Sequence, residues 1–171
     1  MATLGYTTIG GSTQNFFNAN QAIGVPLTVP SDFSSLVSIS SYGNANSGTV
    51  GVKGFITNGS GTILTNGIAP ALTATTTPGW WTNTYVTPPT LHSGDSIFLC
   101  LIVNGNYIIN LDSPGGMQSF KDNSNNYTTP TNPVVTVDNG SLYSLYLTYI
   151  TTSGGTVTNI TSITNISTLK F

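Results

Sequence analysis

No stretch of this chain keeps the 3.6-residue period of an amphipathic helix for three turns. Short runs of β-branched and aromatic residues instead alternate with clusters of Gly, Asn, Pro and Ser, which is the pattern of strands separated by turns. The pattern predicts strands at residues 21–29, 36–42, 49–57, 62–66, 80–87, 96–103, 107–111, 134–138 and 142–151. About nine strands at this spacing, in a chain long enough for one domain, predict an all-β fold of two packed antiparallel sheets.

Turn and burial patterns refine this prediction. The dipeptides Asn58-Gly59 and Asn104-Gly105 each join two consecutive predicted strands, and Asn-Gly tolerates the positive φ angles of a tight hairpin. The strand at 96–103 is apolar on both faces, which predicts a central strand that is covered above and below. The strand at 49–57 alternates, and we expect Lys53 to lie on a solvent-exposed face of it.

The charge of the chain excludes several classes of function. The sequence has three lysines, five aspartates and neither arginine nor glutamate. Three cations cannot neutralise a row of phosphates, so we do not expect direct nucleic-acid binding.

No run approaches the roughly 18 apolar residues of a membrane span. The first residues lack the basic start and apolar stretch of a secretory signal, so we expect the protein to be made and folded in a cytoplasm.

The residues that could support catalysis are few. His92 is the only histidine, and it lies beside Ser93 and Asp95 in the sequence. A catalytic triad is assembled in space, whereas neighbours on a turn usually point apart, so we interpret 91–95 as a solvent-exposed turn. Cys100 is the only cysteine and sits in an apolar run, which indicates an inert core thiol rather than a nucleophile. We therefore expect no enzymatic activity.

One segment offers oxygen ligands for a cation. Asp122, Ser124 and Asn126 alternate within the long loop predicted at 113–133, as in a calcium-binding loop. The glycine and the closing acidic residue of such a loop are missing. A polar loop is the favoured interpretation, and we expect no metal and no cofactor.

Trp80 and Trp81 are adjacent on a predicted strand. Neighbouring side chains on a strand point to opposite faces, so we expect one tryptophan in the core and the other facing out. The outward ring could be a platform for a sugar, a contact between subunits or a lid on the edge of the sandwich. The second and third of these roles are together favoured over glycan binding.

The end of the chain has a different period. Between residues 157 and 171 an apolar side chain recurs at every third position, and Thr, Asn and Ser fill the spaces between them. This fits neither a strand nor a helix, and an extended segment must satisfy its backbone on another surface. We predict an arm that contacts other subunits through Val157, Ile160, Ile163, Ile166, Leu169 and Phe171. A last strand with a bulge remains the alternative.

Several motifs resemble those of a known group of modules. The segment PGWWTNTYVTPPTLHSGDSIFLCLIVNGN has Gly79-Trp80 at a strand start, then Pro88-Pro89, then Leu91-x-x-Gly94-Asp95 and an apolar strand. Over about 21–150 the chain resembles jelly-roll β-sandwich modules of virion accessory proteins, such as capsid decoration proteins and fibres, and of carbohydrate-binding or cell-surface modules. The resemblance implies a jelly-roll-like antiparallel β-sandwich, and it does not choose between those uses.

We therefore expect a β-sandwich domain at 21–151, an N-terminal extension at 1–20 and an extended C-terminal arm at 152–171. The expected function is that of a virion structural protein, a capsid decoration or minor capsid protein as in a bacteriophage, which stabilises a symmetric shell through subunit contacts and its arms. The expected partners are further copies of the chain, with a homotrimer favoured, and a major capsid or other virion protein, and assembly occurs in the host cytoplasm. The alternatives are a carbohydrate-binding adhesion module, with a glycan as partner, and a surface-filament subunit.

The arm interpretation gives a first testable prediction. Replacing Ile163 by Asp places a charge in the repeated apolar positions of the arm, so it should disrupt assembly more than it lowers the melting temperature. Sedimentation measures the assembly, and thermal unfolding followed by circular dichroism measures the stability. A large fall in melting temperature with the oligomer intact would favour the bulged strand.

Overall fold

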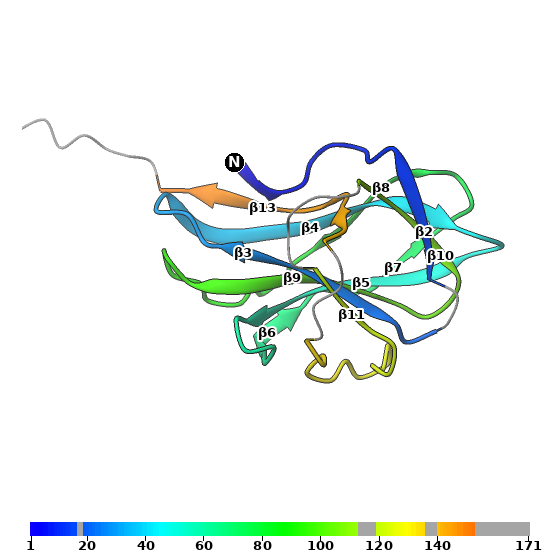
Figure 1. The fold of residues 1–171 in the computed structure, drawn as a ribbon. Coiled ribbons are helices and arrows are strands. Elements are labelled where there is room, and N and C mark those ends of the chain that lie inside the picture. The colour runs from blue at the N-terminus through cyan, green and yellow to red at the C-terminus, as the bar shows by residue number, and fades with distance from the viewer. Residues whose placement is uncertain (17–18, 113–118, 136–139, 153–171) are drawn as a thin grey trace, which may run out of the picture.

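The computed structural model describes residues 1–16, 19–112, 119–135 and 140–152, and these form two antiparallel sheets with no helix (Figure 1). The first sheet contains β1 (Ala2–Gly5), β2 (Ser12–Phe16), β4 (Phe33–Ala45), β8 (Gly79–Thr84), β10 (Tyr107–Asp112), β12 (Leu142–Tyr143) and β13 (Leu145–Thr151). The second contains β3 (Ala22–Thr28), β5 (Val50–Asn58), β6 (Ile63–Ile68), β7 (Leu72–Ala74), β9 (Ser96–Val103) and β11 (Phe120–Asp122). Within these ranges, no helix exists that is long and apolar enough to cross a membrane.

The two packed antiparallel sheets confirm the predicted all-β sandwich. In the first sheet β13 and β10 pair with successive stretches of one side of β4, while β8 pairs with the other side. In the second sheet the order is β3, β9, β5 and then β6 with β7. Figure 1 shows the layer of β13 and β4 above the layer of β9 and β5.

The main core fills the space between the sheets. Alternate residues of each central strand point inward, and Ile39, Leu101, Tyr107 and Leu147 are at most 1% exposed. The contact between layers is close: a Cβ added to Gly54 of β5 would lie 2.8 Å from Cβ of Ile39. Apolar burial on this scale is the main favourable term in folding, so the layers are held together chiefly by this core.

The first twenty residues differ from the extension that the sequence suggested. β1 pairs antiparallel with β13, and β2 pairs antiparallel with β10, so both are edge strands of the first sheet. The Tyr6 amide continues the ladder by donating to the Leu145 carbonyl at 2.9 Å. This segment therefore belongs to the sandwich. Of the predicted arm at 152–171, only Thr152 lies within the described residues.

The outer face of the second sheet is covered by the chain itself. Residues 119–135, which we call the cover, lie between β10 and β12 in the sequence, pair with β3 through β11 and lie over β9 and β5. Phe120 of the cover is fully buried, and its ring centroid lies 5.3 Å from that of Phe98. Cys100 is fully buried in the same cluster, and burial raises the pKa of its thiol. The prediction that 96–103 is covered on both faces is confirmed, as is a buried thiol.

The solvent-exposed position predicted for Lys53 is wrong. Its ammonium donates a hydrogen bond to the Tyr127 carbonyl at 2.7 Å and lies 4.4 Å from the centroid of the Tyr127 ring. Both contacts come from Tyr127 of the cover, which lies 74 residues away in the sequence. The alternating pattern of β5 identified two faces, but it contained no signal that a distant loop covers the more polar one.

The turn predictions have a mixed outcome. Asn58-Gly59 joins β5 to β6, which pair as a hairpin, although the positive φ falls at Gly61. Asn104-Gly105 follows β9 and precedes β10, and these strands belong to different sheets, so the predicted hairpin there is wrong. A dipeptide that favours a tight reversal does not specify whether the chain returns to the same sheet.

One predicted strand is not found where the structure describes it. Residues 134–135 of the strand predicted at 134–138 are not in a strand, and the rest of it lies outside the described residues.

The cover generates a second testable prediction. Replacing Phe120 by Ala should lower the free energy of unfolding by about 3–5 kcal/mol, because it leaves a cavity between the cover and β9. The Cys100 thiol should also react faster with a maleimide under native conditions. Urea unfolding and the labelling rate measure the two effects. Val134→Ala is the control, since Val134 is 62% exposed. If both quantities match the wild type, the cover does not protect this face.

Candidate functional site

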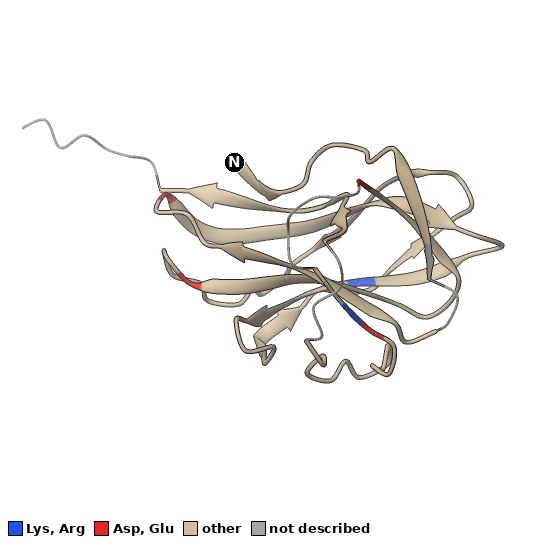
Figure 2. Ribbon diagram, in the orientation of Figure 1, with Lys and Arg blue, Asp and Glu red and all other residues tan. Residues whose placement is uncertain are grey.

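The candidate site is the outer face of the first sheet, which the cover does not reach. Three neighbouring strands direct alternate residues to this face, in the registers Tyr42↔Trp80 and Ser40↔Thr82 between β4 and β8, and Ser40↔Tyr146 between β4 and β13. The outward residues of these strands carry no charge and are mainly polar or aromatic, although Ile150 of β13 is a 49% exposed aliphatic residue. Figure 2 shows no charged residue along β13 or β8. The part of the face formed by β4, β8 and β13 can therefore approach another surface without burying an ion.

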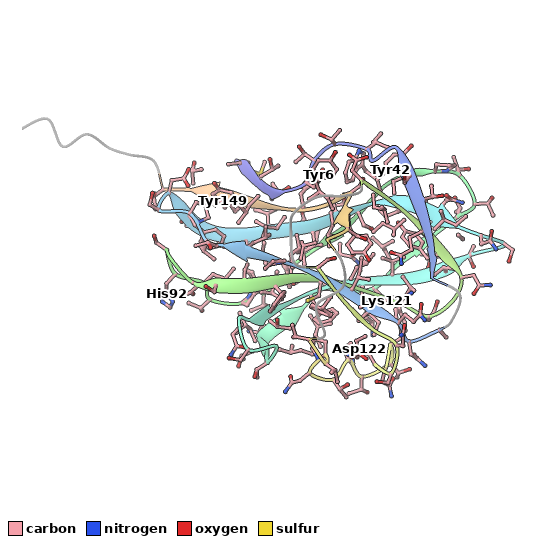
Figure 3. All side chains as sticks on the ribbon, in the orientation of Figure 1. Tyr6, Tyr42, His92, Lys121, Asp122 and Tyr149 are labelled. Atoms are coloured by element: carbon pink, nitrogen blue, oxygen red, sulfur yellow. The ribbon has the colours of Figure 1, made fainter. Side chains whose placement is uncertain are left out.

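Three aromatic rings from three strands meet on this face, and we call them the aromatic cluster. The Trp80 ring centroid lies 5.4 Å from that of Tyr42 and 4.9 Å from that of Tyr146, at interplanar angles of 70° and 64°. Ser40, beside them, is only 2% exposed, and its hydroxyl lies 2.8 Å from that of Thr82. All three aromatic side chains remain partly exposed. Figure 3 marks Tyr42 among the sticks of this layer.

Trp81 points the other way. It packs against the main core, and its indole N–H donates to the Gly43 carbonyl at 2.8 Å. The structure therefore places Trp80 outward and Trp81 toward the core, as the alternation of a strand predicts. Sequence analysis identified the pair but not Tyr42. The register between β4 and β8 brings Tyr42 opposite Trp80, and this pairing has no local signal.

The His92 region is an exposed turn, as predicted. The side chain of His92 is 78% exposed, and its Nδ1 lies 3.6 Å from Oδ2 of Asp95. The Asp95 carboxylate accepts a hydrogen bond from the His92 backbone amide at 2.7 Å, so it closes the turn. Ser93 is exposed on the same turn. The three residues do not form the relay of a hydrolytic triad.

Asp122 organises the cover. Its Oδ1 accepts hydrogen bonds from the amide and hydroxyl of Ser124 at 2.9 and 3.0 Å, and its Oδ2 accepts from the Asn125 side chain and the Val134 amide. Burial alone would raise the pKa of Asp122, but these hydrogen bonds outweigh it and hold the pKa below its usual range. Asn126 directs its oxygen to the Thr128 amide instead. Asp122 and Asn126 thus bind the loop's own donors.

A second carboxylate fixes the N-terminal segment. Asp112 accepts hydrogen bonds from the Tyr6 hydroxyl and, at 2.8 Å, from the Gly11 amide, and together these lower its pKa. The contact holds the link between β1 and β2 against the end of β10. In the part of the chain that the structure describes, no group of three or more His, Cys, Asp or Glu side chains could hold a metal ion.

The remaining predicted site residues cannot be placed. They lie outside the described residues and are Val157, Ile160, Ile163, Ile166, Leu169 and Phe171.

A shallow depression of about 280 Å³ lies where β3 ends and β9 begins. It is lined by residues such as Pro26, Thr28 and Phe98, and no charged side chain lines it. Thr28 and Ser96 supply its polar side chains, and nothing in this lining identifies a specific ligand.

The chain was also compared with known proteins. No protein-family model matches it, and neither a curated protein nor a solved structure matches it at a significant level.

The opposite orientations of the two tryptophans give a third testable prediction. Trp81→Ala should lower the free energy of unfolding by about 3–5 kcal/mol, because it removes a large side chain that packs against the main core and a hydrogen bond to Gly43. Trp80→Ala should cost less, about 1–3 kcal/mol, because it removes two edge-to-face contacts of a partly exposed ring. Urea unfolding of both variants compares them directly. Equal costs, or the reverse order, would contradict these roles.

Proposed function

We propose that this chain is a non-enzymatic structural protein of a virus particle, a capsid decoration or minor capsid protein that works in a symmetric assembly. The observation that carries the proposal is the outer face of the first sheet, where the aromatic cluster lies among hydroxyl-bearing residues without a charge. Aromatic rings are enriched at contact surfaces and charged residues are depleted from their centres. Jelly-roll sandwiches are also a common architecture of viral capsid domains and of lectins.

The composition supports repeated contacts between copies. Thr, Ser, Asn and Gly keep a surface soluble without charge, so identical copies can pack closely without like-charge repulsion. Few long charged side chains also means that little side-chain entropy is lost at each contact. The proposed partners are further copies, as a homotrimer, and a major capsid or other virion protein. The terminal segment with its apolar side chain at every third position, residues 157–171, supplies the arm.

Glycan binding is the main alternative, and it calls for exposed aromatic rings that lie coplanar along a groove. The rings of the aromatic cluster meet edge to face, at 64° and 70°, and they are in contact with one another. This geometry fills the space between the rings instead of leaving a slot for a sugar. We therefore propose no second function.

Deleting residues 157–171 tests the proposal and is the fourth prediction. The full chain should form a trimer whose population rises with concentration, while the truncated chain should stay monomeric with an unchanged melting temperature. Native mass spectrometry measures the assembly, and circular dichroism follows the unfolding. Unfolding of the truncated domain would mean that the segment completes the sandwich. The proposal would be contradicted if the full chain is monomeric at every concentration, both alone and when mixed with the virus particles.

A further inference from the structure

β8 forms a free edge of the first sheet. It pairs with β4 along Gly79–Thr84, and no other strand among the described residues pairs with it. The strand contains neither a charged residue nor a proline, and its register with β4 runs without a bulge. Natural proteins usually protect edges with charges, prolines, bulges or short strands, because an open edge accepts a further strand.

The hydrogen-bond pattern shows which backbone groups face outward. The Tyr85 amide donates to the Val37 carbonyl at 3.0 Å, so Val37 and Tyr85 occupy a hydrogen-bonded position of the ladder between β4 and β8. In an antiparallel ladder such pairs alternate with pairs whose amides and carbonyls point away. Trp80, Thr82 and Thr84 are the alternate positions and therefore direct their N–H and C=O groups away from β4. Their side chains lie on the same face as the aromatic cluster.

The other edges of the sandwich are less suitable. On the N-terminal edge, β1 has four residues and is separated from β2 by the link at 6–11. On the second sheet, β6 has a register shift against β5 and a positive φ at Asn66. β11 has three residues, two of which are charged. Among the described strands, β8 is the longest regular edge without such protection.

We propose that the edge of β8 binds part of residues 157–171 of a second copy, which adds as a further strand next to Trp80. This inference rests on the proposed function, because it identifies the surface that receives the arm. The segment has no proline, carries one charge at Lys170 and is rich in Thr and Ile, which favour strands. Fully extended, it spans about 50 Å, more than the roughly 20 Å of β8. An Ile on the outer face would contact the aromatic cluster.

The direction of β13 favours a second copy over the same chain. β13 and β8 are both antiparallel to β4 and therefore run the same way. Thr151 pairs with Phe33, near the start of β4, and the Thr152 amide donates to the Asp32 carbonyl at 2.7 Å. The chain therefore leaves the sheet heading past the end of β8. Its own segment would have to reverse direction to reach that edge, whereas the segment of a neighbour meets no such constraint.

The test is a proline at the centre of the edge, and it is the fifth prediction. Thr82→Pro removes an amide that points away from β4, so the sandwich should fold as before while the oligomer is lost. Thr82→Val is the matched control, since it loses the hydroxyl contact with Ser40 but keeps the outward amide, and it should assemble like the wild type. Thr3→Pro places the same change on the β1 edge and should also assemble. Native mass spectrometry and melting temperature are measured for each.

A second experiment identifies the segment that binds the β8 edge, and it also tests the inference if Thr82→Pro does not fold. In a Cys100→Ala background, chains with Thr82→Cys are mixed with chains that carry one cysteine at a position between 158 and 164. Disulfides between the two kinds of chain are expected at one or more positions. Their absence at every position, or a disulfide only when both cysteines are in one chain, overturns the inference.

The outcomes also separate this inference from the proposed function. If deletion of 157–171 abolishes the oligomer and Thr82→Pro folds and assembles like the wild type, the arm binds elsewhere and only this inference fails. If the truncated chain assembles normally, the proposed role of the arm fails, and this inference with it.

Discussion

The structure depends on one requirement, which is that β9 must be covered on both faces. Burial of Leu99 and Leu101 against the first sheet forms the main core. Cys100 and Ile102 point the other way and would face water without the cover. Leaving such a face exposed would cost roughly 25 cal/mol for each Å² of apolar surface, so the chain needs a segment that lies over it. Residues 119–135, which lie between β10 and β12 in the sequence, are the segment that lies over this face.

The few charged side chains are used to hold irregular segments in place. Asp122 orders the cover through its hydrogen bonds, and Lys53 attaches the cover to β5. Asp112 holds the link between β1 and β2, and Asp95 closes the turn before β9. Each of these segments lacks a strand partner over part of its length, and a charge-assisted hydrogen bond is stronger than a neutral one. As a result, the outward residues of β4, β8 and β13 carry no charge.

The alternation of residues along a strand correctly predicted which side chains point to which face of a sheet. The two apolar faces of 96–103 and the opposite orientations of Trp80 and Trp81 follow from the period of a strand, and the structure has both. The partners of each strand depend on contacts far apart in the sequence. For this reason the sequence did not indicate that β1 and β2 join the first sheet, that the cover reaches Lys53, or that the chain changes sheets after β9.

The two outer faces of the sandwich are therefore not equivalent. The second sheet is completed by the chain's own cover, which buries Phe120 against β9. The first sheet has no such cover among the described residues, yet it carries the aromatic cluster in the middle of its outer face. Rings placed on a surface without a partner leave apolar area in contact with water, which is a cost unless another surface covers it. This asymmetry, with the open edge at β8 beside the cluster, is the physical reason for expecting a contact between copies on this side.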